Sequence, residues 1–216
     1  MTHFANADQE DSPSVKNQLE KFLKITELFS QSQFKTHQFL KSAANSGAVL
    51  NYPEACLDIV RPGLMLYGVS PSYQIYPKNQ LNLNLKPLMT LRAKIISLHV
   101  LNIGERVGYG SSWRALRETR LAVISIGYGD GYPQHAKEGT PVLIRGQKAY
   151  LAGRVSMDSM TVDVTDIEQV SIGDTVILWG ENLPIEEVAY FMGVSVYALL
   201  TGVTSRVAME MRELIG

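Results

Sequence analysis

The sequence has little of several residue types, and each shortage argues against a class of protein. Cys56 is the only cysteine, so no disulfide can form within the chain, which fits a reducing compartment. The apolar runs are short, and none reaches the roughly 18 residues of a membrane helix. The acidic start MTHFANADQED is unlike a signal peptide. We therefore expect a cytoplasmic protein that does not enter a membrane.

Charge of one sign is also lacking, because 20 basic side chains stand against 21 acidic ones. Nucleic acid and anionic lipid surfaces are therefore poor partners. The histidines are spaced unlike metal ligands, so we predict no metal site. What remains is the composition of a globular protein, with 45% hydrophobic and 19% charged residues in a chain of 216.

The first third of the chain has an α/β pattern. His3-Phe4-Ala5 is consistent with the end of a strand, and Ser12 followed by Pro13 marks the start of a helix over residues 13–33. A strand and turn follow at 44–47, with a short helix over 53–57. The apolar run 63–69, bounded by prolines, predicts a buried strand. Together these elements suggest parallel βαβ units.

Beyond residue 70 the pattern changes. Residues 71–86 form an Asn-rich linker, and the following segments are short, rich in Val, Ile, Leu and Thr, and separated by turn residues. They predict a β domain of barrel or sandwich type. The predicted strands are 88–100, 120–127, 141–145, 160–164 and 175–179. Pro184 opens a helix that runs to Met192, and another helical turn covers 197–200.

A few parallel strands with helices are an incomplete architecture, because parallel sheets are usually buried on both faces. We therefore expect that the chain lacks an N-terminal part or is completed by another chain.

Several motifs, in matching order and spacing, resemble alanine racemases. They are THFANAD at 2–8, ANSGA through DIVRPGLMLYG at 44–68, GERVGYGSSWRA at 104–115, IGYGDGYP through AGRVSMDSM at 126–160, and VYALLTGVTSRV at 196–207. The resemblance implies residues 1–70 as the last β/α units of a (β/α)8 barrel and 87–216 as a mainly β C-terminal domain. It also implies a homodimer whose active sites are shared between subunits.

The same resemblance implies pyridoxal 5'-phosphate as cofactor and a small amino acid, alanine, as substrate. The lysine that forms the Schiff base, and an arginine for the substrate carboxylate, would lie in the missing N-terminal barrel segment. Lys148 is in the β domain and is rejected as the cofactor lysine. The 216-residue chain by itself is therefore expected to be inactive.

Racemisation needs one base on each face of the substrate, and the resemblance assigns one of them to Tyr109 in VGYGSS. An unperturbed phenol has a pKa of about 10, so this role requires cationic or hydrogen-bonding neighbours. Arg61 in VRPG is similar to the arginine at the pyridine nitrogen, where a guanidinium forbids protonation of the ring. The ordinary alternative for Tyr109 is a tyrosine packed in a turn, and the alternative for Arg61 is a surface ion pair.

The remaining site residues are also assigned by resemblance. His3 would pack on the cofactor ring, and the phosphate set would be Ser46, Gly63, Leu64 and Tyr197, although Ser46 also suits a helix cap and Tyr197 a core. Met157 would offer its backbone N–H to the substrate carboxylate. Tyr128 would narrow the substrate corridor, which Asp8, Arg154 and Asp158 would line.

Two features depart from the family pattern: Ala198 replaces a glutamate beside Tyr197, and the ending RVAMEM is unusual. Two alternatives stay open. One is a related racemase for a larger amino acid, and the other is a non-catalytic β module for dimerisation.

Overall fold

The computed structural model describes residues 1–31, 39–71 and 83–211, which form two compact units, Met1–Leu88 and Met89–Gly216. Each unit is described by itself. The predicted linker 71–86 lies largely outside the described residues, as do the last two residues of the predicted helix 13–33.

The first unit is a small α/β assembly. Helix α1 (Pro13–Gln31) precedes strand β1 (Ser42–Asn45), helix α2 (Ser46–Asn51) and the 3-10 turn η1 (Pro53–Ala55). Strand β2 (Ile59–Arg61) pairs with β1 in parallel, as predicted for βαβ units, and the 3-10 turn η2 (Leu64–Tyr67) follows. The unit therefore places the carboxyl ends of two neighbouring strands side by side.

A compact core holds this unit together. Val15 and Leu19 on one face of α1 belong to the same buried cluster as Phe4 and the alanines of β1. Tyr52 is buried. Its hydroxyl accepts a hydrogen bond from the Ser12 N–H and donates one to the Gln9 carbonyl, both at 2.6 Å. The N-terminal segment is thereby fixed against the helices although it forms no strand itself.

Two strand predictions in this unit are wrong. Residues 3–5 have no strand pairing of their own. Residues 63–69 form η2 instead of a strand: the Leu66 N–H donates to the Gly63 carbonyl, and Gly68 ends the turn with a φ of 79°. An apolar run alone cannot distinguish a strand from a short helical turn, and Leu66 is exposed rather than buried.

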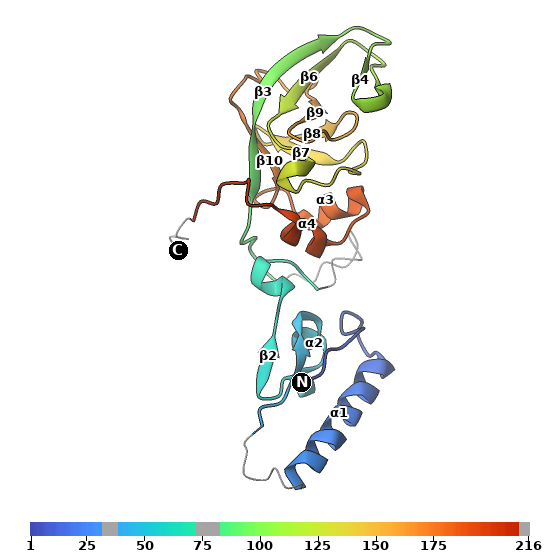
Figure 1. Cartoon of the computed structure of the whole chain (residues 1–216), viewed down its shortest axis with the longest axis vertical. Coiled ribbons are helices and arrows are strands. Elements are labelled where there is room, and N and C mark those ends of the chain that lie inside the picture. The colour runs from blue at the N-terminus through green and yellow to red at the C-terminus, as the bar shows by residue number, and fades with distance from the viewer. Residues whose placement is uncertain (32–38, 72–82, 212–216) are drawn as a thin grey trace. The chain divides into compact units, whose positions relative to one another are not determined.

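The second unit contains a closed barrel of six antiparallel strands in the order β10-β3-β6-β9-β8-β7 (Figure 1). Closure removes the unpaired edges that an open sheet would expose. The barrel interior is apolar, and Ile124, Ile144, Val162 and Leu178 are fully buried. The strands are β3 (Leu91–Leu101), β6 (Thr119–Ile124), β7 (Pro141–Ile144), β8 (Gln147–Leu151), β9 (Met160–Asp163) and β10 (Thr175–Trp179).

Smaller elements are attached to this barrel. Strands β4 (Arg106–Val107) and β5 (Trp113–Arg114) form a hairpin around the 3-10 turn η4 (Tyr109–Ser111), and the 3-10 turn η5 (Tyr128–Asp130) follows β6. Helices α3 (Ile185–Met192) and α4 (Val196–Gly202) lie together beside the barrel (Figure 1). The five predicted strands and both helices are present here, and the predicted barrel-or-sandwich domain is a barrel.

Candidate active site

The first group of candidate residues lies at the carboxyl ends of β1 and β2. Asn45 and Arg61 are partners across this parallel pair, and Ser46 follows Asn45 directly. The Asn45 side chain accepts from the Ala48 N–H at 3.0 Å and so caps α2. The capping role that suits Ser46 in the sequence therefore belongs to Asn45. The Ser46 hydroxyl accepts from the Met65 N–H at 3.4 Å and lies beside the turn that follows Arg61.

The Arg61 guanidinium is held by three neighbours from the N-terminal segment and β1. It donates to the hydroxyl of Ser42, to the carbonyl of Thr2 at 2.8 Å, and contacts Nδ1 of His3 at 3.4 Å. Because arginine has donors only, His3 Nδ1 must be the acceptor in this contact. The structure therefore brings His3 and Arg61 together, as the resemblance implies, and adds Ser42, which the sequence analysis missed.

Backbone packing brings the remaining candidates of this unit close to the same strand ends. A side chain at Gly47 would place its Cβ 2.5 Å from the Ala7 carbonyl oxygen and 2.8 Å from the Asp8 nitrogen, so only glycine allows this contact. At Gly63, no heavy atom of the described residues other than its own chain neighbours lies within 4 Å of the equivalent position. Leu64, which follows it, buries its side chain. Backbone at 63–64 is thus available to a ligand.

Tyr109 projects from the tip of the β4–β5 hairpin. Gly108, Gly110 and Ser111 all adopt positive φ (84°, 72° and 50°), which reverses the chain tightly around the tyrosine. The Tyr109 side chain is 68% exposed, and within the described part of the chain its hydroxyl has no hydrogen bond. The hairpin therefore presents a phenol outward, which is unlike a packed turn tyrosine.

The segment carrying Arg154 supports this hairpin. A Cβ at Gly108 would lie 3.1 Å from the Arg154 nitrogen and 3.4 Å from the Gly153 Cα. Arg154 and Tyr109 are thereby on neighbouring segments of the second unit.

Tyr128, Met157 and Asp158 form another neighbourhood in the second unit. The Tyr128 N–H donates to the Ser156 carbonyl at 3.0 Å, and the Gly129 N–H donates to the Met157 carbonyl at 2.9 Å. Tyr128 and Met157 are both partly exposed, at 36% and 52%. Among the described residues, none accepts a hydrogen bond from the Met157 N–H, so this donor is available to a ligand.

Arg206 joins this neighbourhood although the sequence analysis gave it no role. Its guanidinium makes an ion pair with Asp158 at 2.5 Å and another with Asp130 at 3.2 Å. The hydrogen bond to Asp158 and the charge of Asp130 raise the pKa of Arg206 above its usual value. The sequence did contain a signal for this residue, because Arg206 is the only charged residue of the motif at 196–207.

Tyr197 lies on α4 and is 52% exposed, so it is not the core aromatic of the alternative prediction. Ser195 caps this helix by accepting from the Ala198 N–H at 3.2 Å.

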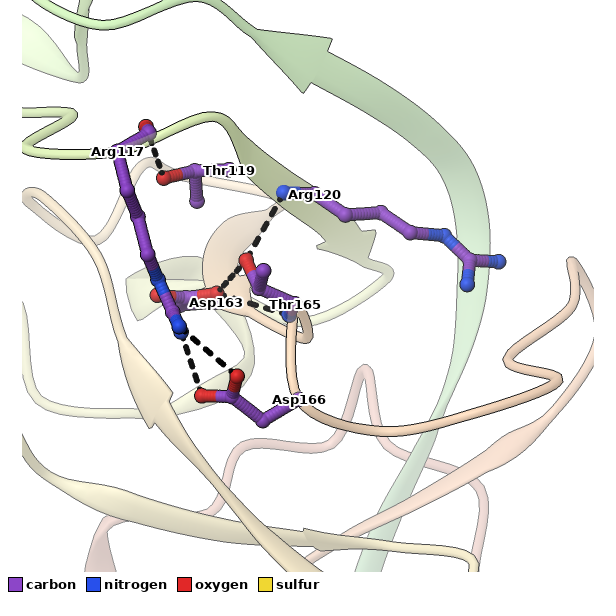
Figure 2. Close-up of polar contacts among 6 residues, drawn as sticks. All are labelled: Arg117, Thr119, Arg120, Asp163, Thr165 and Asp166. Carbon is purple, nitrogen blue, oxygen red and sulfur yellow. Dashed lines mark hydrogen bonds and ion pairs between the residues drawn. The ribbon is translucent and has the colours of Figure 1, made fainter.

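A cavity of about 420 Å³ lies elsewhere on the barrel and includes none of the predicted site residues. It is lined by β8 together with Trp113, Asp163 and Asp166. Figure 2 shows that the two carboxylates are already engaged: Asp166 accepts two hydrogen bonds from Arg117, and Asp163 accepts from Thr165. The Arg117–Asp166 contact fastens the chain after β9 to the segment before β6, so the carboxylates serve the fold.

The chain's two halves both match families of known proteins. The model described as "Alanine racemase, N-terminal domain" matches residues 1–71, and "Alanine racemase, C-terminal domain" matches residues 88–211. The chain belongs to the alanine racemase family. The resemblance seen in the sequence motifs is thereby confirmed, and so is membership of a family of isomerases.

Individual alanine racemases agree with this assignment. The biosynthetic alanine racemase of Pseudomonas aeruginosa is 46% identical over 96% of this chain and 55% of its own length. The alanine racemase of Vesicomyosocius okutanii is 47% identical over 96% of this chain and 55% of its own length. The chain thus spans about half the length of the curated relatives it matches.

Solved alanine racemases share the fold. The biosynthetic enzyme of Pseudomonas aeruginosa has a TM-score of 0.83 at 46% identity, over 95% of this chain and 54% of its own. The enzyme of Bartonella henselae, described with covalently bound pyridoxal phosphate, has a TM-score of 0.83 at 31% identity, with the same coverage.

No helix in residues 1–31, 39–71 or 83–211 is both long and apolar enough to cross a membrane. The same residues hold no group of three or more His, Cys, Asp or Glu side chains arranged to bind a metal ion.

Proposed function

We propose that this chain is the C-terminal part of an alanine racemase that interconverts L- and D-alanine with pyridoxal 5'-phosphate. The observation that carries the proposal is the cluster of Arg61, His3 and Ser46 at the ends of two parallel strands. Ligands bind at the carboxyl ends of such strands in β/α barrels. The family assignment adds that relatives at 46% identity bear the name alanine racemase.

The residues of the first unit fit the proposed cofactor. Arg61 has three contacts with described residues, whereas a guanidinium carries five N–H groups, so two N–H groups have no partner among the described residues. Aimed at a pyridine nitrogen, it would donate a hydrogen bond and keep that nitrogen unprotonated. The Ser46 hydroxyl and the open backbone at Gly63 and Leu64 suit a phosphate, to which Tyr197 would add a phenol.

When bound, pyridoxal phosphate makes the α-proton of an amino acid acidic by delocalising the resulting charge. The residues of this chain would then move protons and orient the substrate. Tyr109 would hold or remove the α-proton on one face, and its outward position on a tight hairpin suits that role. The base for the other face would be a lysine outside residues 1–216.

The second unit would also select the substrate. The Met157 N–H, which has no acceptor in residues 1–31, 39–71 and 83–211, would donate to the alanine carboxylate, and the Tyr128 ring would limit the size of the substrate side chain. Asp8, Arg154 and Asp158 would line the approach.

The wider assembly is part of the proposal. Residues 1–70 would complete a (β/α)8 barrel with a preceding segment, and residues 87–216 would form the β domain of a cytoplasmic homodimer. The exposed apolar side chains of Ile59 and Val60 on β2 support this, because strands of parallel sheets are normally covered on both faces.

The test uses a completed racemase, in which the residues of the Pseudomonas aeruginosa enzyme outside the match are joined ahead of residue 1. We expect this protein to bind pyridoxal phosphate and to racemise alanine faster than larger amino acids, whereas residues 1–216 alone should be inactive. Preference for a larger amino acid would point to the related racemase. Cofactor binding with no racemisation of any amino acid would contradict the proposal.

A further inference from the structure

Arg206 links two segments of the second unit through two carboxylates. Its Nε pairs with Asp130 Oδ1 at 3.2 Å, and its Nη2 pairs with Asp158 Oδ1 at 2.5 Å. A guanidinium is a planar fork with donors in fixed directions, so one side chain can bridge two acids. Asp130 belongs to η5, and Asp158 follows Met157.

The Asp130 end of this bridge fixes the turn that carries Tyr128. Asp130 Oδ2 accepts from the Gly127 N–H at 2.9 Å, and the Asp130 carbonyl accepts from the Thr204 N–H at 3.0 Å. The Thr204 hydroxyl donates to the Gly129 carbonyl at 3.0 Å. Thr204, two residues before Arg206, therefore holds the η5 turn at both Gly129 and Asp130.

The Asp158 end fixes the neighbouring segment. Tyr128 and Gly129 donate their N–H groups to the carbonyls of residues 156 and 157, so the turn and this segment are already paired. Arg206 adds a side-chain link between them, because it pairs with Asp130 of the turn and with Asp158 of the neighbouring segment. A side chain at Gly129 would place its Cβ 2.3 Å from Arg206 Nη1, which shows that the guanidinium lies directly over the turn's backbone.

We propose that Arg206 is a positioning residue for substrate binding: it holds Tyr128 and Met157 in one arrangement and neutralises Asp158 beside the substrate carboxylate. The proposal rests on the proposed function, which places the alanine carboxylate at the Met157 N–H. An unpaired Asp158 would repel that carboxylate. Arg206 itself touches no substrate, and its effect should therefore appear in binding rather than in proton transfer.

The kinetic test uses the completed racemase and its Arg206→Ala, Arg206→Lys and Arg117→Ala variants. We expect Arg206→Ala to raise the KM for alanine about fivefold to tenfold with kcat changed less than about twofold. Arg206→Lys should recover part of this loss, because a single ammonium keeps the charge but reaches one acid. Arg117→Ala removes an arginine of similar exposure (52%, against 49% for Arg206) that pairs with a single carboxylate, that of Asp166, and it should leave KM unchanged.

Asp158→Asn, placed in the Arg206→Ala variant, separates charge from geometry. It should lower the raised KM, because the repulsion disappears with the carboxylate. An unchanged KM in Arg206→Ala, or an equal rise in Arg117→Ala, would overturn the proposal.

Amide hydrogen exchange measured on residues 1–216 tests the positioning role of Arg206 independently of the proposed function. Arg206→Ala should speed exchange of the Tyr128 and Gly129 amides about fivefold, and Arg117→Ala should not. If the completed wild-type protein does not racemise alanine, the proposed function fails, and the exchange rates still decide whether Arg206 holds the turn. Unchanged exchange in Arg206→Ala would overturn the positioning role in either case.

Discussion

Single residues shape the candidate site mainly through backbone constraints. Gly47, Gly127 and Gly129 each lie so close to neighbouring backbone or side-chain atoms that a Cβ would approach within 2.5 Å of one of them. Gly127 and Gly129 flank Tyr128, and Gly47 follows Ser46 within α2. Close approach at glycine thus sets the position of side chains that are proposed to bind ligand.

Gly131 gives a prediction at this scale. It adopts a φ of 98°, and a Cβ there would lie 2.0 Å from the Gly202 carbonyl oxygen. Gly131→Ala should destabilise the protein by roughly 3 kcal/mol, because it combines an unfavourable φ with a backbone clash. Urea unfolding monitored by tryptophan fluorescence measures this, since both tryptophans, Trp113 and Trp179, lie in the second unit.

Gly139→Ala is the matched control. Gly139 has a φ of 81°, and in the described part of the chain no heavy atom beyond its chain neighbours lies within 4 Å of the added Cβ, so its substitution should cost only about 1 kcal/mol. Equal losses at both positions would show that the contact between residues 131 and 202 is absent in solution.

The sequence motifs predicted which candidate residues lie together better than they predicted the other residues that hold them in place. Motifs alone indicated Arg61 with His3, and the structure joins them. Ser42 and Arg206 were missed because their contacts come from segments distant in sequence, and no local spacing reveals such pairs. The roles assigned to the candidate residues remain predictions.

At the scale of elements, hydrophobic patterns located most strands of the barrel. Strand β8 was missed because its first residues, Gln147 and Lys148, are exposed and polar. The turn before it, Arg145-Gly146, has positive φ at both residues (51° and 78°), which is the geometry of a two-residue hairpin. Arginine is an unusual residue at the first of these positions, so the turn gave only a weak signal.

The attachment of the chain after β9 predicts a pH effect. Hydrogen bonds from Arg117 hold the pKa of Asp166 below its usual value. A carboxylate with a lowered folded pKa stabilises the protein above its unfolded pKa of about 4, and this contribution is lost as the pH falls through the folded value. Asp166→Asn should therefore reduce the loss of stability between about pH 5 and pH 2.

The measurement is the urea midpoint at both pH values for Asp166→Asn, Arg117→Gln and the double variant. The effect should be small because both side chains are exposed. Either single substitution should produce it, and the double variant should add nothing. Additive effects would mean that the two side chains act separately.

At the scale of the molecule, the two units differ in architecture. The second contains a closed barrel, whereas the first has a two-stranded parallel sheet with exposed apolar side chains at Ile59 and Val60. The sequence predicted the change from an α/β unit to a β unit, because helical spacing gives way to short segments rich in Val, Ile, Leu and Thr that turn residues separate. It cannot predict how the units meet, since that depends on surfaces rather than on local pattern.

The central claim is that Tyr109 acts as the base on one face of the substrate in a two-base racemisation. In the completed racemase, Tyr109→Phe keeps the ring and removes the hydroxyl. Racemisation of L-alanine should fall by about 10²-fold or more, as expected on removal of a general base. The base on the opposite face would remain, so the α-proton of D-alanine should still exchange with solvent without inversion.

The decisive measurement is therefore incorporation of deuterium into each enantiomer of alanine in heavy water, with Tyr150→Phe as a control at an exposed tyrosine on β8. The account predicts that Tyr109→Phe loses exchange of L-alanine and retains that of D-alanine, while the control exchanges both. Undiminished exchange and racemisation of L-alanine by Tyr109→Phe would contradict it.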